Sequence, residues 1–335
     1  METISFVIIN RNNRLYLNKC LESIDKLTYQ NKEIVLVDDH STDDSLHLLD
    51  IKPHKLIKHH RNLGIAPSRN KGVKQSKGKI VFIIDSDIEI TRVNIKKIVN
   101  VFEKNEKLVA LSGKYISKGK SNGNKILDAR RIHIFGKDKK EIVYNLNNYT
   151  TFSGGFCAIH KERLGNITQK GKPLVGGEDI LFQLKLINKG YKFSYVPYMI
   201  GTHHHKRNTR KTILKAKSEA KGDVWLTSEA LKQGIRLPIF ISIFSFPIFL
   251  LAGIIFLQPP LVFIEFLPNL YLIVRHRKLV FVYLLLYDFL LYIFYIYYTF
   301  IFLIGNESLN IKAKYLYNGI KCNILGKYYW FKNQL

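Results

Sequence analysis

The 335-residue sequence is poor in the residues that mark a secreted, disulfide-stabilised protein. Its three cysteines, Cys20, Cys157 and Cys322, lie far apart and match no metal-binding spacing. We therefore expect neither a disulfide framework nor a cysteine-ligated metal, as is usual in a reducing compartment. The first residues lack the basic segment of a secretory signal peptide, so none is expected.

Acidic residues are also scarce: 26 Asp and Glu stand against 52 Lys and Arg, which gives a net charge of +26. Such a charge is typical of proteins that bind nucleic acid or anionic membranes. The lysines are dispersed, however, and no nucleic-acid-binding module is recognisable, so nucleic acid is not an expected partner. Anionic membrane lipids or a phosphate-bearing substrate are the favoured partners.

Long uncharged runs are absent from residues 1–235 but dominate residues 236–304. Residues 238–257 hold no charge and residues 279–304 hold one acid, so each run is long enough to span a bilayer. The sequence therefore predicts a globular domain, then membrane-embedded transmembrane helices over residues 236–304, then a basic tail over residues 305–335. The alternative for the apolar runs is a buried helical core domain.

The globular part shows a regular alternation of short apolar runs and amphipathic segments. Runs at residues 5–9, 33–37, 55–58 and 80–84 predict strands, and apolar residues spaced three and four apart between them predict helices. This alternation is typical of a parallel sheet with right-handed crossovers. The predicted fold class is therefore α/β.

Two of the predicted strands end in acids: Asp38 and Asp39 in one case, and Asp85, Asp87 and Glu89 in the other. Alternate residues of an extended chain point the same way, so the last three acids can project to one side. The carboxyl ends of parallel strands meet at one crevice, where uncompensated charge is costly. A divalent cation, Mg²⁺ or Mn²⁺, would compensate it. The alternative is a solvated acidic turn.

Six sequence blocks, in order, resemble those of family 2 glycosyltransferases. They are residues 5–12, 37–43, 62–72 and 85–87, the pair Gly154-Gly155, and residues 177–179. The resemblance implies a GT-A fold, which is a Rossmann-like nucleotide-diphospho-sugar transferase domain. Within residues 1–235 it implies a nucleotide-sugar-binding half, residues 1–112, and an acceptor-binding half, residues 113–235.

The resemblance also implies a donor site. Asp39 matches the acid that hydrogen-bonds the nucleotide base, and Arg69 could reach the diphosphate, since a guanidinium binds oxyanions bidentately. The alternatives are a helix-capping acid for Asp39 and an exposed helix residue for Arg69. The expected donor-binding residues are Asn10, Asp39, Asn62, Gly64, Arg69, Asp85 and Ser86.

A metal site follows from the same resemblance. Asp85 and Asp87 match the family's metal-binding motif, and a histidine at the distance of His203 from the preceding strand occurs in many members. His205 is the next candidate, and imidazole is a suitable Mn²⁺ ligand. These four residues are the expected ligands of Mn²⁺ or Mg²⁺. The alternative for the histidines is a polar surface run.

On the acceptor side, Gly154 and Gly155 match a loop whose glycines let the backbone approach a sugar closely. Glu178 and Asp179 match the family's acidic pair, in which Asp179 is the general base that takes a proton from the acceptor hydroxyl. The alternatives are an ordinary turn before a strand for the glycines and a helix N-cap for Asp179.

The implied function is inverting, metal-dependent transfer of a single sugar from a nucleotide-sugar donor to a membrane-bound acceptor. A lipid-linked saccharide and a polyprenyl phosphate are both possible acceptors. The Gln-x-x-Arg-Trp motif of processive members is missing before Trp225. The expected location is the plasma membrane, with several crossings and a cytoplasmic catalytic domain.

Two other functions are open. One is a non-catalytic nucleotide-sugar-binding scaffold subunit of a membrane glycan-synthesis complex. The other is a nucleotidyltransferase, which would carry a glycine-rich basic loop where this chain has Asn10-Arg11-Asn12-Asn13.

Overall fold

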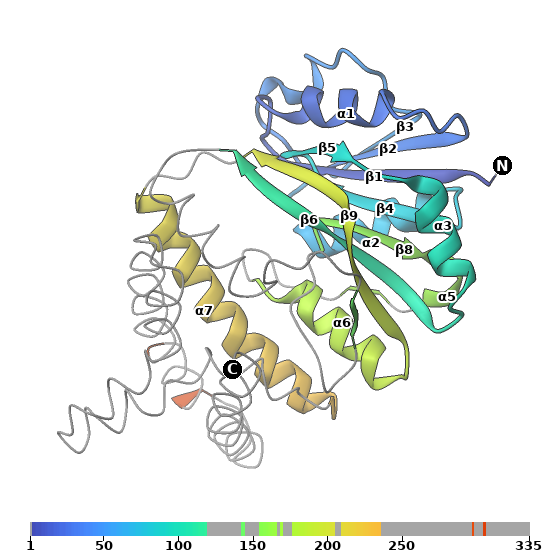
Figure 1. The fold of residues 1–335 in the computed structure, drawn as a ribbon. Helices are drawn as coiled ribbons and strands as arrows, with labels where there is room; N and C mark the ends of the chain where they lie inside the picture. The colour runs from blue at the N-terminus through green and yellow to red at the C-terminus, as the bar shows by residue number, and fades with distance from the viewer. Residues whose placement is uncertain are drawn as a thin grey trace, which may run out of the picture.

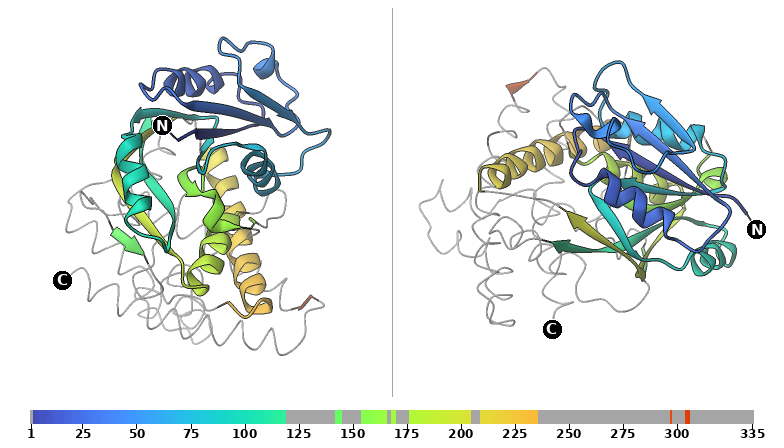
Figure 2. Two further views of the ribbon diagram at one scale, coloured as in Figure 1. Left: turned by 90° about the vertical axis from the view of Figure 1, so that its right-hand side faces the viewer. Right: turned by 90° about the horizontal axis from the view of Figure 1, so that it is seen from above.

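The computed structural model describes residues 2–118, 142–144, 154–165, 168–169, 176–204 and 209–235, together with residues 297, 304 and 305. In this part the chain forms one nine-stranded sheet with helices on both faces (Figures 1 and 2). No helix among the described residues combines the length and hydropathy needed to cross a bilayer. The membrane segments and the tail predicted after residue 235 lie, apart from those three residues, outside the described part.

The first half of the chain alternates strands and helices as the sequence predicts. Its elements are β1 Ile4–Asn10, α1 Leu17–Asp25, β2 Lys32–Asp38, the 3₁₀ helix η1 Asp44–Leu46, β3 Lys55–Lys58, α2 Ile65–Gln75, β4 Ile80–Asp85, β5 Ile88–Arg92 and α3 Ile95–Glu103. Strands β3, β2, β1 and β4 lie side by side and pair in parallel, in that order. The parallel pairing sets Asn10 opposite Asp38, and Ile9 opposite Asp85.

The second half departs from the parallel pattern. Its elements are β6 Leu108–Lys118, β7 Ile142–Tyr144, β8 Phe156–His160, α5 Lys161–Leu164, α6 Glu178–Asn188, β9 Lys192–His204 and α7 Thr209–Lys232. Strand β8 pairs antiparallel with β4 and β6, and β9 pairs parallel with β6 but antiparallel with β5 and β7. The prediction of a parallel sheet, which was based on the four apolar runs of the first half, is therefore correct for β1 to β4. The second half adds strands of both directions, because these strands are not joined by regular strand–helix–strand crossovers.

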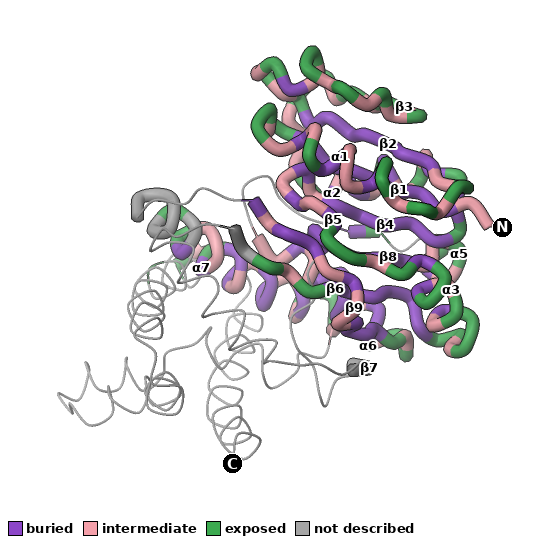
Figure 3. The backbone as a smooth tube through the Cα atoms, turned by 45° about the horizontal axis from the view of Figure 1, so that its top comes forward, coloured by how far each residue is buried: buried purple, intermediate pink, exposed green. Residues whose placement is uncertain are grey.

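The sheet has a hydrophobic core on each face, since alternate residues of one strand point to opposite sides. Phe6 and Ile8 of β1 belong to the core shared with α1 and α3, and Val7 and Ile9 belong to the core shared with α2 and α6. Figure 3 shows β1, β2 and β4 as buried strands in the middle of the described part. Because these strands are parallel, their carboxyl ends lie at one edge of the sheet, and burial on both faces fixes them there.

Candidate active site

A pocket of about 550 Å³ lies at the carboxyl ends of β1, β2 and β4. This is the edge at which open α/β sheets bind ligands. The loops after the strands, the N-terminal ends of α2 and α6, and one residue of α7 line it. The lining residues are Ile9, Arg11, Asn12, Asn13, Asp39, Asn62, Gly64, Ile65, Asp85, Ser86, Asp87, Gly176, Glu178 and Ser218.

Seven of the residues predicted from the sequence thus line one pocket, and they come from both halves of the domain. A larger cavity, of about 800 Å³, lies beside α2, but the only predicted site residue in its lining is Arg69. Its lining is largely apolar, with lysines at α2 and α5, so it lacks the acids expected of the catalytic site. We therefore take the smaller pocket as the candidate active site.

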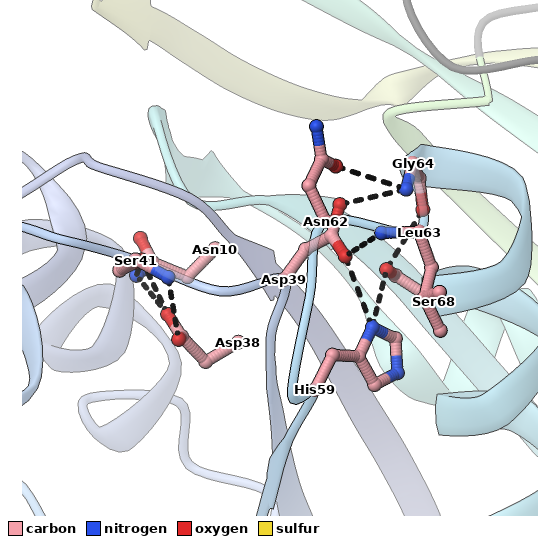
Figure 4. Close-up of polar contacts among 9 residues, drawn as sticks. All are labelled: Asn10, Asp38, Asp39, Ser41, His59, Asn62, Leu63, Gly64 and Ser68. Carbon is pink, nitrogen blue, oxygen red and sulfur yellow. Dashed lines mark hydrogen bonds and ion pairs between the residues drawn. The ribbon is translucent and has the colours of Figure 1, made fainter.

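The carboxylate of Asp39, at the wall of this pocket, accepts hydrogen bonds from backbone N–H groups of the loop before α2 and contacts His59 (Figure 4). It accepts hydrogen bonds from the backbone N–H of Leu63, at 2.7 Å, and of Gly64, at 2.9 Å. His59 Nδ1 lies 3.0 Å from Asp39 Oδ1, and Ser68 Oγ lies 3.4 Å from the same nitrogen. Because both contacts use one ring nitrogen, these residues do not form a Ser–His–Asp catalytic relay.

The same contacts explain Gly64 and Asn62. Gly64 has φ 92°, a backbone conformation that favours glycine, and its N–H also donates to Asn62 Oδ1 at 3.1 Å. The loop that leads into α2 is therefore held by the carboxylate of Asp39, which follows β2, and by the side chain of Asn62, which belongs to the loop itself. The donor-binding role of Asp39 and Asn62 stays a prediction.

Asn10 lies behind the pocket and is fully buried. Its Nδ2 donates to Asp38 Oδ1 at 2.9 Å and is also within hydrogen-bond distance of Ser41 and Ser45. Asp38 accepts further hydrogen bonds from the backbone and side chain of Ser41. Asn10 thus fixes the end of β1 to the end of β2, and its predicted contact with the donor is not part of the described pocket lining.

Arg69 is the centre of an acidic cluster next to the pocket. Its side chain is 3% exposed, which contradicts the alternative of an exposed helix residue. One guanidinium nitrogen lies 3.2 Å from Asp85 Oδ1 and the other lies 3.1 Å from Glu178 Oε1. Burial lowers the pKa of Arg69, but Asp85 and Glu178 outweigh this effect and raise the pKa above its ordinary value. Arg69 is therefore a buried cation that joins β4 to α6.

Glu178 titrates unusually in this cluster. Burial and the neighbouring Asp179 raise its pKa to about 7, and Arg69 opposes them in part. A carboxyl group with such a pKa at the wall of a pocket is a frequent feature of functional sites. Asp179 itself accepts hydrogen bonds from the N–H of Gly154, at 3.1 Å, and of Ile180, at 2.9 Å.

Gly154 and Gly155 approach these acids closely. A Cβ on Gly155 would lie 2.2 Å from Asp85 Oδ2, and one on Gly154 would lie 2.6 Å from the Arg69 guanidinium. Both distances are too short for real contacts, so the backbone at these positions packs against the site only because no side chain is present. The glycines are thus part of the acidic cluster, whereas their contact with an acceptor stays a prediction.

Two histidine–carboxylate pairs join β9 to the turn after β4 and to β5. His203 Nε2 lies 3.0 Å from Asp87 Oδ2, and His204 Nε2 lies 2.6 Å from Glu89 Oε2. In the described part of the chain no three His, Cys, Asp or Glu side chains form a group that could hold a metal ion, and His205 lies outside that part. A carboxylate and an imidazole do suit Mn²⁺ or Mg²⁺ when phosphate oxygens and water complete the coordination.

Four lining residues with polar or charged side chains are not among the site residues expected from the sequence: Arg11, Asn12, Asn13 and Ser218. The first three follow β1 directly, so their position after a buried strand was the signal that could have identified them. Asn13 Nδ2 donates to Ser86 Oγ at 2.9 Å and thereby joins the loops after β1 and β4. Ser218 lies on α7, and nothing in the local sequence marks it.

Comparison with known proteins agrees with this geometry. The family model described as "Glycosyl transferase family 2" matches residues 5–167. The chain is 31% identical over 196 residues to an Escherichia coli protein, "UDP-Glc:alpha-D-GlcNAc-diphosphoundecaprenol beta-1,3-glucosyltransferase WfaP", with 57% of this chain and 73% of that one covered. It is 35% identical over 128 residues to "Glycosyltransferase GlyG" of Streptococcus pneumoniae, with 37% and 42% covered.

A "Poly-beta-1,6-N-acetyl-D-glucosamine synthase" of Staphylococcus epidermidis is 28% identical over 204 residues, with 59% of this chain and 48% of the synthase covered. The match thus spans less than half the length of GlyG and of the synthase. Among solved structures, S. aureus TarS 1-349 in complex with UDP superposes with a TM-score of 0.50 at 20% identity, with 68% of this chain and 65% of that one covered.

The structural likeness confirms the predicted α/β, GT-A-like fold for the described domain. The sequence relatives add the family, because the E. coli protein is matched over most of its own length. The order of the sequence blocks and the pocket at the strand ends agree with these relatives. We conclude that this chain belongs to glycosyl transferase family 2.

Proposed function

We propose that this protein transfers a single sugar from a nucleoside-diphosphate sugar to a membrane-bound acceptor, with inversion at the anomeric carbon and with the help of Mn²⁺ or Mg²⁺. One observation carries the proposal: Asp85 and Asp87, at the end of β4, line the same pocket as Glu178, at the start of α6, and Asp179 is the next residue of that helix. The acids after β4 can serve the leaving diphosphate, and Asp179 can serve the attacking hydroxyl.

On the donor side, Asp87 and His203 are the residues that would hold the metal, with Asp85 beside them and His205 as the further candidate. A bound divalent cation would stabilise the negative charge on the departing nucleoside diphosphate. Asn13 fixes Ser86, between the two aspartates, and Arg69 fixes the carboxylate of Asp85. The name of the E. coli relative, which specifies UDP-Glc, supports a UDP-sugar as the donor.

On the acceptor side, Asp179 is the proposed general base. Its two hydrogen bonds from Gly154 and Ile180 fix the carboxylate and use about half of its acceptor capacity. The remaining lone pairs can accept the proton of an acceptor hydroxyl as it attacks the sugar. Glu178, tied to Arg69, holds the start of α6 against β4 and so positions its neighbour.

The acceptor is proposed to be a lipid-linked saccharide. The name of the E. coli relative specifies a GlcNAc-diphosphoundecaprenol acceptor, and residues 236–304 of this chain have the composition of membrane segments. A saccharide hydroxyl is a weak acid that needs a base such as Asp179, whereas a polyprenyl phosphate would not. The catalytic domain is proposed to face the cytoplasm from the plasma membrane.

The alternative of a non-catalytic scaffold subunit explains less of the site. Binding of a nucleotide sugar alone requires neither Glu178 in the pocket lining nor Asp179 beside it. The buried Arg69 that holds Asp85 and Glu178 together would then be a costly arrangement without a use.

Nucleotide-dependent thermal stabilisation of detergent-solubilised protein tests the donor site. We expect UDP to raise the melting temperature of the wild type in the presence of Mn²⁺ more than in the presence of a chelator. The Asp87→Ala variant should lose the metal-dependent part. Asp44→Ala, at an exposed acid near the neighbouring strand end, is the matched control and should behave as the wild type. If UDP, GDP and dTDP all fail to stabilise a folded wild type, the proposed function is wrong.

Sugar transfer by the Asp179→Asn variant tests the base. Its turnover should fall by a factor of about 10² to 10⁴, the usual contribution of a general base, while UDP binding stays close to that of the wild type. A variant with near wild-type turnover on a saccharide acceptor would remove Asp179 from this role.

A further inference from the structure

The charge of the donor pocket is unusual for a site that is to bind a diphosphate. Its lining includes four carboxylates, from Asp39, Asp85, Asp87 and Glu178, and among the described residues that line it Arg11 is the only cation. A diphosphate entering such a pocket meets repulsion that a single divalent metal offsets only in part. The site therefore needs at least one further positive group.

Arg69, the predicted diphosphate ligand, is poorly placed for this task. It is almost fully buried, does not line the pocket, and has both terminal guanidinium nitrogens engaged by Asp85 and Glu178. To reach a phosphate it would have to leave the buried Glu178 and the part-buried Asp85 without a cation, which is costly.

Arg11 has the opposite properties. It is exposed, it lines the pocket, and its side chain forms no hydrogen bond or ion pair with the described part of the chain. Its backbone, however, lies in a well-fixed loop. Asn10 is tied to Asp38, Asn13 to Ser86, and the N–H of Arg14 to Asp43.

The turn after Arg11 is equally well determined. Asn12 has φ 50°, in the left-handed region that asparagine tolerates better than most residues, and its Oδ1 accepts a hydrogen bond from the N–H of Thr42 at 2.7 Å. A loop fixed by these hydrogen bonds thus carries, in the lining of an acidic pocket, a guanidinium that has no partner among the residues that the structure describes.

We propose that Arg11 binds the diphosphate of the donor and so takes the part that the sequence assigned to Arg69. This inference rests on the proposed function, because it assumes that the pocket receives a nucleoside diphosphate. A planar guanidinium can donate two parallel hydrogen bonds to phosphate oxygens, and little conformational freedom of the loop is lost when it does so.

Calorimetric titration of purified full-length protein with UDP, uridine and inorganic pyrophosphate, in Mg²⁺-containing buffer, tests the proposal. For Arg11→Ala we expect the Kd of UDP and of pyrophosphate to rise about tenfold or more, the usual effect of losing a charge-assisted contact. The Kd of uridine should stay unchanged, because uridine carries no phosphate.

Arg14→Ala is the matched control. It removes the same charge three residues away, from a side chain that pairs with Asp44 at 3.3 Å and does not line the pocket. It should bind all three probes as the wild type does. Arg11→Lys, which keeps the charge but loses the planar fork, should lie between Arg11→Ala and the wild type.

The outcomes separate this inference from the proposed function. If wild type binds UDP and Arg11→Ala binds it equally well, the assignment of Arg11 is wrong and the proposed function stands. An equal loss of UDP and uridine would mean that Arg11 contacts the nucleoside, which also overturns the assignment. If the wild type binds neither UDP nor pyrophosphate, the assignment of Arg11 and the proposed function are both wrong.

Discussion

The ends of β2 and β4 carry the same sequence feature, two acids at the end of a buried strand, but the two pairs have different partners. Asp38 and Asp39, the β2 acid pair, are each 3% exposed; backbone N–H groups donate hydrogen bonds to both, and the imidazole of His59 also contacts Asp39. Asp85 and Asp87, the β4 acid pair, have side chains 30% and 31% exposed and contact a guanidinium and an imidazole.

This difference shows how one pattern can serve two purposes. Backbone N–H groups are fixed donors, so the β2 acid pair holds loops in place, and Asp39 does so at the pocket wall. The side chains of the β4 acid pair are about one third exposed, so they can take up a ligand. Acids at a strand end therefore indicate where a site lies, and their donors indicate which acids are available to it.

The largest expected effect concerns the cation beside the β4 acid pair. Arg69→Met leaves Asp85 and Glu178 facing each other without a cation, and should lower the free energy of unfolding by about 3–5 kcal/mol. Urea-induced unfolding of the solubilised protein measures this change. Arg14→Met, which breaks an exposed ion pair, should cost less than about 1 kcal/mol.

A second variant keeps this prediction testable if Arg69→Met does not fold. In Arg69→Met/Glu178→Gln one of the two stranded acids is neutral, so part of the stability should return. If the Arg69→Met and Arg14→Met variants are equally stable, the buried cation does not hold the β4 end in place.

A smaller effect is expected at the β2 acid pair. Asp39→Asn replaces an acceptor oxygen with an amide N–H group that faces the N–H groups of Leu63 and Gly64. The free energy of unfolding should fall by about 1–3 kcal/mol, because at least one buried donor loses its acceptor. Urea-induced unfolding, with the exposed Asp44→Asn as control, measures the change.

The affinity of the Asp39→Asn variant for UDP, measured alongside its stability, tests the same contrast. Unchanged stability of Asp39→Asn together with a loss of UDP binding would show that Asp39 serves the nucleotide base and not the framework. The contrast between the two acid pairs would then be wrong.

The last expected effect is a change in pH dependence. Burial and the neighbouring Asp179 raise the pKa of Glu178 from its ordinary value of 4.5 to about 7 in the folded protein. Between these values the folded protein holds a proton that the unfolded chain has released, so this group's contribution to stability decreases as the pH rises from about 4.5 to about 7. Glu178→Gln should flatten this decrease, which urea-induced unfolding at a series of pH values would detect. A pH dependence identical to that of the wild type would contradict the raised pKa.

Much of the site could be predicted because its signals are local. A buried strand that ends in acids is visible within ten residues, and Asp39, Asp85, Ser86 and Asp87 do line the pocket. Gly64 and Asn62 were identified in the same way, from a short block that leads into a helix.

The rest depends on partners distant in sequence. Glu178, which pairs with Arg69, is 109 residues away, and Asp87 meets His203 across 116 residues. No local pattern distinguishes a buried arginine from an exposed one on α2. The sequence therefore suggests Arg69 as a diphosphate ligand and gives no reason to choose Arg11. The mixed pairing of β6, β8 and β9 was missed for the same reason, since short apolar runs do not encode strand direction.

Asp39 also occupies the N-terminal end of α2, where a helix attracts anions. In many nucleotide-binding sites this position receives a phosphate of the ligand. Here the N–H groups of Leu63 and Gly64 donate to a carboxylate of the protein itself, which acts as a permanent internal anion. If the proposed donor binds here, its phosphates must therefore be neutralised by another cation, either a side chain or a metal. We therefore expect affinity for that donor to depend on ionic strength and metal concentration more than on the conformation of this loop.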